Sequence, residues 1–79
     1  MTAARVTVYT RAGCGLCATA EADVARICAD EGATWAAVDV DTDPALRAEY
    51  GDRVPVIEVD GREHGYWRVE EDRLRAALS

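Results

Sequence analysis

The sequence contains no lysine, phenylalanine, asparagine or glutamine, and no apolar run as long as a membrane-spanning helix. Such a helix takes about 20 consecutive apolar residues, which no window of the chain approaches. We attribute the missing residue types to a GC-rich genome rather than to function. Nine basic residues, all arginine, against 15 acidic residues give a formal net charge of −6. Because nucleic acids and anionic membranes are bound by basic surfaces, we expect neither as a partner.

The first residues of the chain lack the apolar core of a signal peptide, so we expect a cytoplasmic protein. In that compartment, paired cysteines are more often catalytic or metal-binding than structural. The three cysteines present cannot all pair with one another. The 79 residues suffice for a single domain, 1–79, and leave no room for a second. We take a monomer as the default state.

Two of the cysteines form the motif Cys14-Gly15-Leu16-Cys17, at the junction of a predicted strand and a predicted helix. The free backbone N–H groups and the positive dipole end of a helix start favour an anion at Cys14. Thiols in such motifs have pKa values of about 3.5–7.5, so that much of the thiol is ionised near neutral pH. Cys17 lies one turn further along, close enough to attack a mixed disulfide formed by Cys14. In a βαβ context this spacing is typical of a thioredoxin-like redox motif.

Hydrophobic periodicity predicts four strands and three helices in the order βαβαββα. The expected strands are 5–9, 34–40, 54–59 and 62–67. The expected helices run from residue 14 or 15 to 31, from 45 to 50 and from 70 to 78. Gly32 is placed to end the first helix, and Asp43 and Pro44 to begin the second. Asp60-Gly61 predicts a tight hairpin turn. The expected fold class is therefore α/β, with a mixed four-stranded sheet flanked by helices.

Three stretches resemble the glutaredoxin family of the thioredoxin superfamily, and the resemblance spans nearly the whole chain. They are the strand and Gly-Cys-x-x-Cys block at 8–17, the strand and helix start at 38–44, and the Val-Pro strand with its hairpin at 53–61. The resemblance implies a thioredoxin-like fold of the glutaredoxin type, with a cis Val54–Pro55 peptide bond. It also implies a dithiol oxidoreductase without a cofactor. Such a protein reduces disulfides of proteins or small molecules and is re-reduced by a separate electron donor.

The resemblance also implies roles for individual residues. Cys14 corresponds to the nucleophile and Cys17 to the resolving thiol. Five further residues would contact a bound substrate: Arg11, Leu16, Arg53, Val54 and Pro55. Arg11 stands where the family usually has a lysine near the thiolate, and the backbone of Val54 would pair with an extended substrate.

The segment after the fourth strand departs from the glutaredoxin pattern. Typical members have a Gly-Gly pair and a Ser/Cys-Asp that bind glutathione, whereas here Gly65 is followed by Tyr66-Trp67-Arg68. This departure, with Arg53 in place of a threonine, predicts a donor of the thioredoxin-reductase type rather than glutathione. The Gly-aromatic-Arg pattern resembles the small redoxins that serve ribonucleotide reductase and draw electrons from thioredoxin reductase. It is also similar to a group of short bacterial glutaredoxin-like proteins.

Two other functions stay open from the sequence. One is a thioredoxin-fold binding module without catalysis, and the other is a carrier of an iron–sulfur cluster that bridges two chains. We expect no metal site within one chain, because structural zinc usually takes two close pairs of ligands and here one pair stands with two scattered singles. Cys28 lies about 15 Å along the helix axis from Cys17, too far to share an ion with that pair.

The places of other side chains follow from the predicted elements. Cys28 falls on the apolar face of the first helix, so we expect it in the core. His64 is expected to be a solvated residue of the final hairpin. Trp35 is expected to pack against the core, and Tyr66 and Trp67 to pack on the last helix rather than to form an exposed patch.

Overall fold

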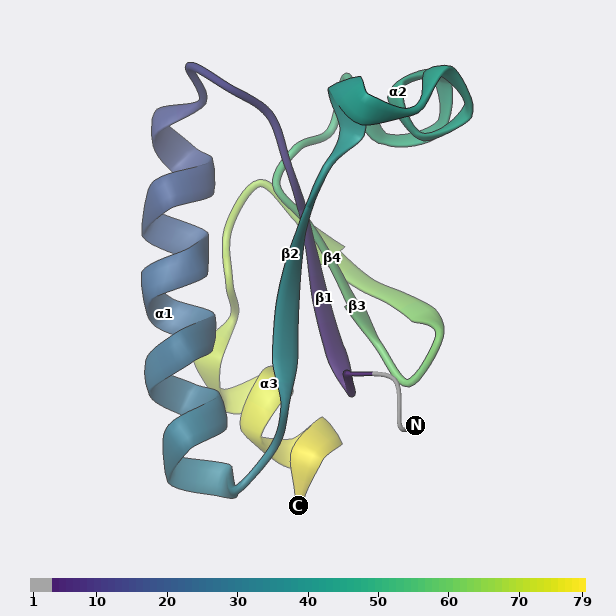
Figure 1. Cartoon of the computed structure of the whole chain (residues 1–79). Coiled ribbons are helices and arrows are strands. Elements are labelled where there is room, and N and C mark those ends of the chain that lie inside the picture. Colours follow the sequence, from purple (N-terminus) through teal and green to yellow (C-terminus); the bar gives the residue numbers. More distant parts are fainter. Residues whose placement is uncertain (1–3) are drawn as a thin grey trace.

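The computed structural model describes residues 4–79. The prediction that the first residues form no signal peptide falls partly on residues 1–3, which lie outside the described residues. Its strands are β1 (Val6–Thr10), β2 (Trp35–Asp39), β3 (Val56–Val59) and β4 (Arg62–Tyr66). Its helices are α1 (Gly15–Glu31), the 3₁₀ helix η1 (Val40–Thr42), α2 (Pro44–Tyr50) and α3 (Glu71–Leu78). The predicted order of strands and helices is confirmed, with η1 as an addition (Figure 1).

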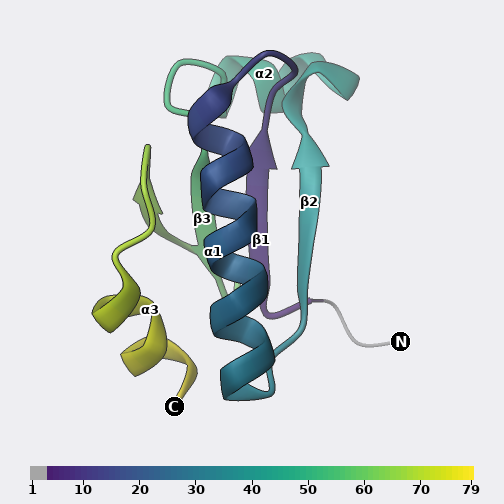
Figure 2. The same ribbon diagram turned by 90° about the vertical axis from the view of Figure 1, so that its left-hand side faces the viewer.

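The four strands form one mixed sheet in the order β2-β1-β3-β4. β1 and β2 are parallel, whereas β1 pairs with β3, and β3 with β4, in antiparallel fashion. Helices α1 and α3 cover the same face of the sheet, and α2 lies beyond one end of it (Figures 1 and 2). The predicted α/β class with a mixed four-stranded sheet is therefore confirmed. No helix in residues 4–79 is both long and apolar enough to cross a membrane.

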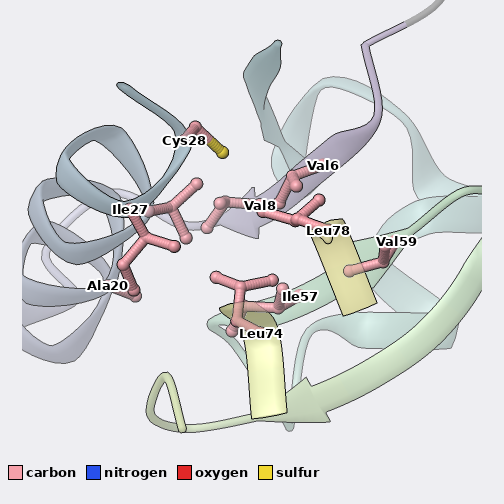
Figure 3. Packing of buried hydrophobic residues seen from close by; sticks show 10 residues of the cluster. Val6, Val8, Ala20, Ile27, Cys28, Ile57, Val59, Leu74 and Leu78 are labelled. Atoms are coloured by element: carbon pink, nitrogen blue, oxygen red, sulfur yellow. The ribbon is translucent and has the colours of Figure 1, made fainter. Parts of the chain in front are cut away.

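The hydrophobic core lies between the sheet and the two helices α1 and α3. Alternate residues of β1 point into it, and α1 contributes apolar positions three and four residues apart, as its periodicity predicts. Figure 3 shows the cluster, whose buried members are Val6, Val8, Ala20, Val24, Ile27, Cys28, Ile57, Val59, Leu74 and Leu78. The predictions that Cys28 lies in this core and that Trp35 packs against it are both confirmed.

The helix ends carry the caps that the sequence predicts. Gly32 ends α1 in the left-handed conformation, with a φ of 69°, which glycine adopts without steric cost. At the start of α2, the carboxylate of Asp43 accepts a hydrogen bond of 2.8 Å from the backbone N–H of Ala45. Pro44 occupies the first position of α2, where its missing N–H has no intrahelical partner to lose.

Charged side chains join α3 to α1 on the surface of the core. The guanidinium of Arg75 is within 3.0 Å of carboxylates of Asp30, Glu31 and Glu71. Arg26 of α1 contacts the same Glu71 at 2.9 Å. A shared carboxylate between two guanidinium groups is a network, and networks contribute more than isolated surface pairs.

All four strands have boundaries that differ from those predicted. β1 is displaced by one residue, to Val6–Thr10, and β2 ends at Asp39, because the chain turns into η1. β3 begins at Val56 rather than at residue 54, because Pro55 has no N–H to donate to a ladder. β4 ends at Tyr66 because Trp67 has a φ of 71°, outside the extended region. The predicted cis Val54–Pro55 peptide bond is confirmed.

Candidate active site

The strand pairing gathers several chain segments at one end of the sheet. Thr10 at the end of β1 pairs with Asp39 at the end of the parallel strand β2. Tyr9 pairs with Val56 at the start of β3, and Val56 pairs in turn with Tyr66 at the end of β4. The loop between β1 and α1, the segment before β3 and the segment after β4 therefore share this end, with α2 beside them (Figure 1).

The two motif cysteines stand at the start of α1, at this end of the sheet. Gly13, with a φ of 77°, turns the chain after β1, and Cys14 is the N-cap residue of α1. The Sγ of Cys14 accepts a hydrogen bond from the backbone N–H of Cys17 at 3.2 Å. Cys14 and Cys17 form a disulfide, with their Cα atoms 5.3 Å apart. The predicted proximity of the two thiols is thereby confirmed.

The surroundings of the disulfide favour an anionic sulfur at Cys14 in the reduced protein. The 17 residues of α1 direct their positive dipole end and free N–H groups at this sulfur. The first turn of α1, which lies wholly within the described residues, carries no acidic side chain to oppose it. Cys14 is half-buried, whereas Cys17 is buried, with 2% of its surface exposed. The pair can therefore perform thiol–disulfide exchange with Cys14 as the accessible sulfur.

The predicted contact residues on the cysteine loop differ in their availability. The Nε of Arg11 donates to a carboxylate oxygen of Asp41 at 3.1 Å, so part of its charge is neutralised by η1. Leu16, between the two cysteines, is 57% exposed, an unusual position for a large apolar side chain. The roles of both in substrate binding stay predictions.

Arg53, predicted to contact a substrate, is held by the protein itself. Its guanidinium contacts the Glu63 carboxylate at 2.6 Å and donates to the backbone carbonyl of Glu49 at 3.0 Å. The same group lies 5.8 Å from the ring centres of both Tyr50 and Tyr66. Arg53 thus links the end of α2 to β4, and its substrate role stays a prediction.

Val54 and Pro55 precede β3, as their predicted role beside a substrate requires. Val54 is half-buried and Pro55 is buried. The carbonyl of Pro55 accepts a hydrogen bond of 2.7 Å from the backbone N–H of Trp67. A hydrogen bond therefore joins the segment before β3 to the segment after β4, at the end of the sheet where the Cys14–Cys17 pair lies.

The sequence did not indicate an aromatic stack between β1 and α2, at the same end of the sheet. The rings of Tyr9 and Tyr50 are stacked, with their centres 4.2 Å apart. Burial, and then the nearby Glu58 carboxylate, raise the pKa of Tyr9 to about 12. Tyr9 therefore stays neutral through the pH range of thiol chemistry. The sequence offered one indirect signal for this stack. Asp43 and Pro44 predicted the start of α2, and Tyr50 was therefore expected at the end of a short helix.

Two predictions about the last hairpin are wrong. Tyr66 and Trp67 are 45% and 54% exposed, because α3 packs Leu74 and Leu78 under the sheet and does not reach the end of β4. His64 is half-buried rather than solvated, and among residues 4–79 its Nε2 is the buried side-chain atom left without a hydrogen-bond partner. Burial, and then the charge of Arg73, lower the pKa of His64.

Metal-binding side chains do not converge in the part of the chain that the structure describes. Within residues 4–79, no three histidine, cysteine or acidic side chains are grouped as metal ligands.

The chain is similar to known proteins in sequence and in fold. The model of the family described as "Glutaredoxin-like domain (DUF836)" matches residues 5–79. The uncharacterized protein Rv0508 of Mycobacterium tuberculosis is 43% identical over 84 residues, which cover all of this chain and 87% of the relative. The X-ray structure of target protein XcR50 from X. campestris matches with a TM-score of 0.73 and 38% identity, over 92% of this chain and 93% of that one. The holo form of glutaredoxin C1 from Populus tremula × tremuloides matches with a TM-score of 0.56 and 25% identity, over 95% and 72% of the two chains.

Proposed function

This chain belongs to the glutaredoxin-like domain family (DUF836), and we propose that it is a thiol–disulfide oxidoreductase that uses its Cys14–Cys17 pair to reduce disulfides. A redox function is supported by the thioredoxin-type fold and by the cysteine pair at the start of α1. The proposal adds the direction of the reaction, the roles of the two sulfurs and the class of electron donor.

The reaction proceeds by two exchanges between sulfur atoms. In the reduced protein, the Cys14 thiolate attacks one sulfur of the substrate disulfide, and the other substrate sulfur leaves as a thiolate. Cys17 loses its proton and attacks the Cys14 sulfur of the mixed disulfide, which releases the second substrate sulfur. Two electrons pass from the protein to the substrate, and the Cys14–Cys17 disulfide remains. A reductase then returns two electrons to this disulfide.

The observation that carries the proposal is the position of Cys14 at the N-cap of α1. A backbone N–H bond to its Sγ and the helix dipole both stabilise a thiolate, the form that attacks disulfides. The burial of Cys17 supports its role as the resolving thiol, since it is shielded from free substrate but lies beside the mixed disulfide.

For the electron donor, we propose a protein of the thioredoxin-reductase class rather than glutathione. Exposed Tyr66 and Trp67 stand at the end of β4, where glutaredoxins that bind glutathione have small residues. Arg53 is engaged by Glu63 and by a backbone carbonyl, which leaves it less free to bind the carboxylate of a small thiol. Both features support a donor that docks as a folded protein.

Single substitutions of the cysteines test the roles. We expect Cys14→Ser to abolish reduction of a model disulfide, because no accessible thiolate remains. We expect Cys17→Ser to accumulate a mixed disulfide with the substrate, visible by mass spectrometry. Cys28→Ala is the matched control, since Cys28 lies in the core away from the pair and its loss should leave turnover intact. Equal residual turnover in the Cys14 and Cys17 variants would contradict the assigned roles.

Coupled assays with NADPH test the donor. One contains glutathione and glutathione reductase, and the other thioredoxin reductase alone. Turnover only in the second supports the proposed donor class, whereas turnover with glutathione contradicts it while leaving the oxidoreductase proposal intact. No consumption of NADPH in either, together with no stoichiometric reduction of a disulfide by the pre-reduced protein, would favour a binding module instead.

A further inference from the structure

A tight turn centred on Trp67 follows β4. The backbone N–H of Arg68 donates to the carbonyl of Tyr66 at 2.9 Å, and Trp67 between them has a φ of 71°. A hydrogen bond across three residues with a positive φ at the centre defines a classic γ-turn, which is rare and strained. A bulky side chain at positive φ is an outlier, and such strain clusters at functional sites.

The neighbours of Trp67 fix this conformation. Its backbone N–H donates to the carbonyl of Pro55, so the turn is tied to the segment that precedes β3. Its indole meets the ring of Tyr66 edge to face, with the ring centres 5.1 Å apart. Tyr66 is held in turn by pairing with Val56 and by the guanidinium of Arg53. The backbone of Trp67 is therefore fixed, and its contact with Tyr66 restricts the orientation of the indole.

The indole is presented to solvent and not to the core. Among the described residues, the exposed large apolar side chains are Leu16, Tyr66 and Trp67. All three lie at the end of the sheet that carries the Cys14–Cys17 disulfide, although they come from α1 and from the end of β4. Exposed apolar side chains at the same end of a sheet as a reactive group indicate a contact surface, and tryptophan is among the side chains most enriched in the energetic centres of interfaces.

The sheet sets the size of the ligand that could use this surface. β4 lies two strands away from β1, and neighbouring strands are about 4.8 Å apart, so roughly 10 Å separates β4, which ends just before Trp67, from the strand that leads to Cys14. An extended peptide advances about 3.3 Å per residue, so about three residues cover this distance. A small free disulfide cannot reach both groups at once, whereas a polypeptide can.

We propose, on the basis of the oxidoreductase function proposed above, that Trp67 determines substrate specificity by binding an apolar or aromatic side chain of a polypeptide about three residues from its disulfide. The preferred substrates are then cysteines in accessible segments of proteins, flanked by a large apolar residue. The strained turn then aims the indole along the substrate rather than under α3.

A single-turnover experiment with the pre-reduced protein tests this inference without an electron donor. The substrates are two disulfide-linked peptide dimers, one with phenylalanine three residues to either side of its cysteine and one with alanine there. A third substrate, hydroxyethyl disulfide, reports the chemistry alone. We expect the wild-type protein to react faster with the phenylalanine dimer by about two- to tenfold, the range that an aromatic pair supplies.

Two variants of Trp67 and one control separate contact from structure. We expect Trp67→Gly to bring the ratio of the two rates close to one, and Trp67→Phe to retain most of it. Because glycine adopts positive φ freely, Trp67→Gly should be at least as stable as the wild type, so a lost ratio cannot reflect unfolding. Trp35→Phe is the control, since Trp35 lies at the opposite end of the sheet and should leave the ratio unchanged.

The outcomes distinguish this inference from the function on which it rests. A wild-type ratio of one, with reduction of all three disulfides, overturns the role of Trp67 and leaves the oxidoreductase intact. A Trp67→Gly variant that keeps the wild-type ratio overturns it as well. A wild-type protein that reduces none of the three disulfides overturns the proposed function itself.

Discussion

Two leucines at opposite ends of the chain permit one substitution to be compared in two environments. Leu74 of α3 is fully buried among core residues, whereas Leu16 beside the disulfide is 57% exposed. Removing a buried leucine side chain costs its transfer free energy and leaves a cavity, about 2–5 kcal/mol together. We expect about 3 kcal/mol for Leu74→Ala, because Val8 and Ile57 on the rigid sheet cannot close the gap but the short terminal helix α3 can move part of the way.

That loss is large for a domain of this size. A chain of 79 residues has a free energy of unfolding of roughly 4–12 kcal/mol. With a urea dependence of about 1 kcal/mol per molar, the unfolding midpoint of Leu74→Ala should fall by about 3 M. Circular dichroism of α1 and α3 during urea titration measures this midpoint. Leu16→Ala, at a solvent-exposed position, should change the free energy of unfolding by no more than about 0.5 kcal/mol.

The activities of the same two variants should show the opposite order. The folded fraction of Leu74→Ala should reduce disulfides at the wild-type rate, because Leu74 lies away from the cysteines. Leu16→Ala should react several-fold more slowly with peptide disulfides, since it loses apolar contact beside Cys14. Similar changes in midpoint for the two variants would refute the assignment of Leu74 to the core and of Leu16 to the surface. An unchanged rate for Leu16→Ala would refute its predicted substrate contact.

Two further predictions concern pH. Hydrogen bonds from Arg26 and Arg75 lower the pKa of Glu71 from 4.5 to about 2. The stability that this carboxylate contributes is therefore complete above its pKa in the unfolded chain and is lost as pH falls through about 2. We expect Glu71→Gln to be less stable at neutral pH and to show a flatter dependence of stability on pH below 4.5. Burial and Arg73 lower the pKa of His64 from 6.5, against an opposing effect of Glu70, so the folded state binds fewer protons and stability should fall as pH drops below 6.5. Urea titrations of His64→Gln across this range should show a shallower fall, and an unchanged pH profile in either variant would contradict the corresponding contact.

The framework of the fold could be predicted from the sequence because each part has a local signal. The three- and four-residue periodicity of α1 placed Cys28 in the core, and Asp43 with Pro44 marked the start of α2. The position of Cys14 at the N-cap followed from the strand before it and the helix after it. These features depend on residues close together in sequence, and the structure confirms them.

The last hairpin was harder to predict because its environment is set by distant residues. Hydrophobicity favours burial of aromatic side chains, but α3 has only eight residues and its two buried leucines fill the space beneath the sheet. Nothing near His64 in sequence indicates that it lines a common pocket with Val69, Glu70 and Arg73. Nothing near Arg53 in sequence indicates that this residue, predicted to contact a substrate, also pairs with Glu63 of β4.

The turn at Trp67 is a feature that the sequence does not predict and that points to a function. Left-handed backbone is predicted from glycine and asparagine, so a tryptophan in that conformation has no sequence signal. Local preference would continue β4 or begin a helix, and the carbonyl of Pro55 and the ring of Tyr66 override it. A sequence under selection for stability alone would place glycine there. The presence of an exposed indole in a strained turn, tied through Pro55 to the segment before β3, is therefore the strongest reason to test this residue for contact with substrate.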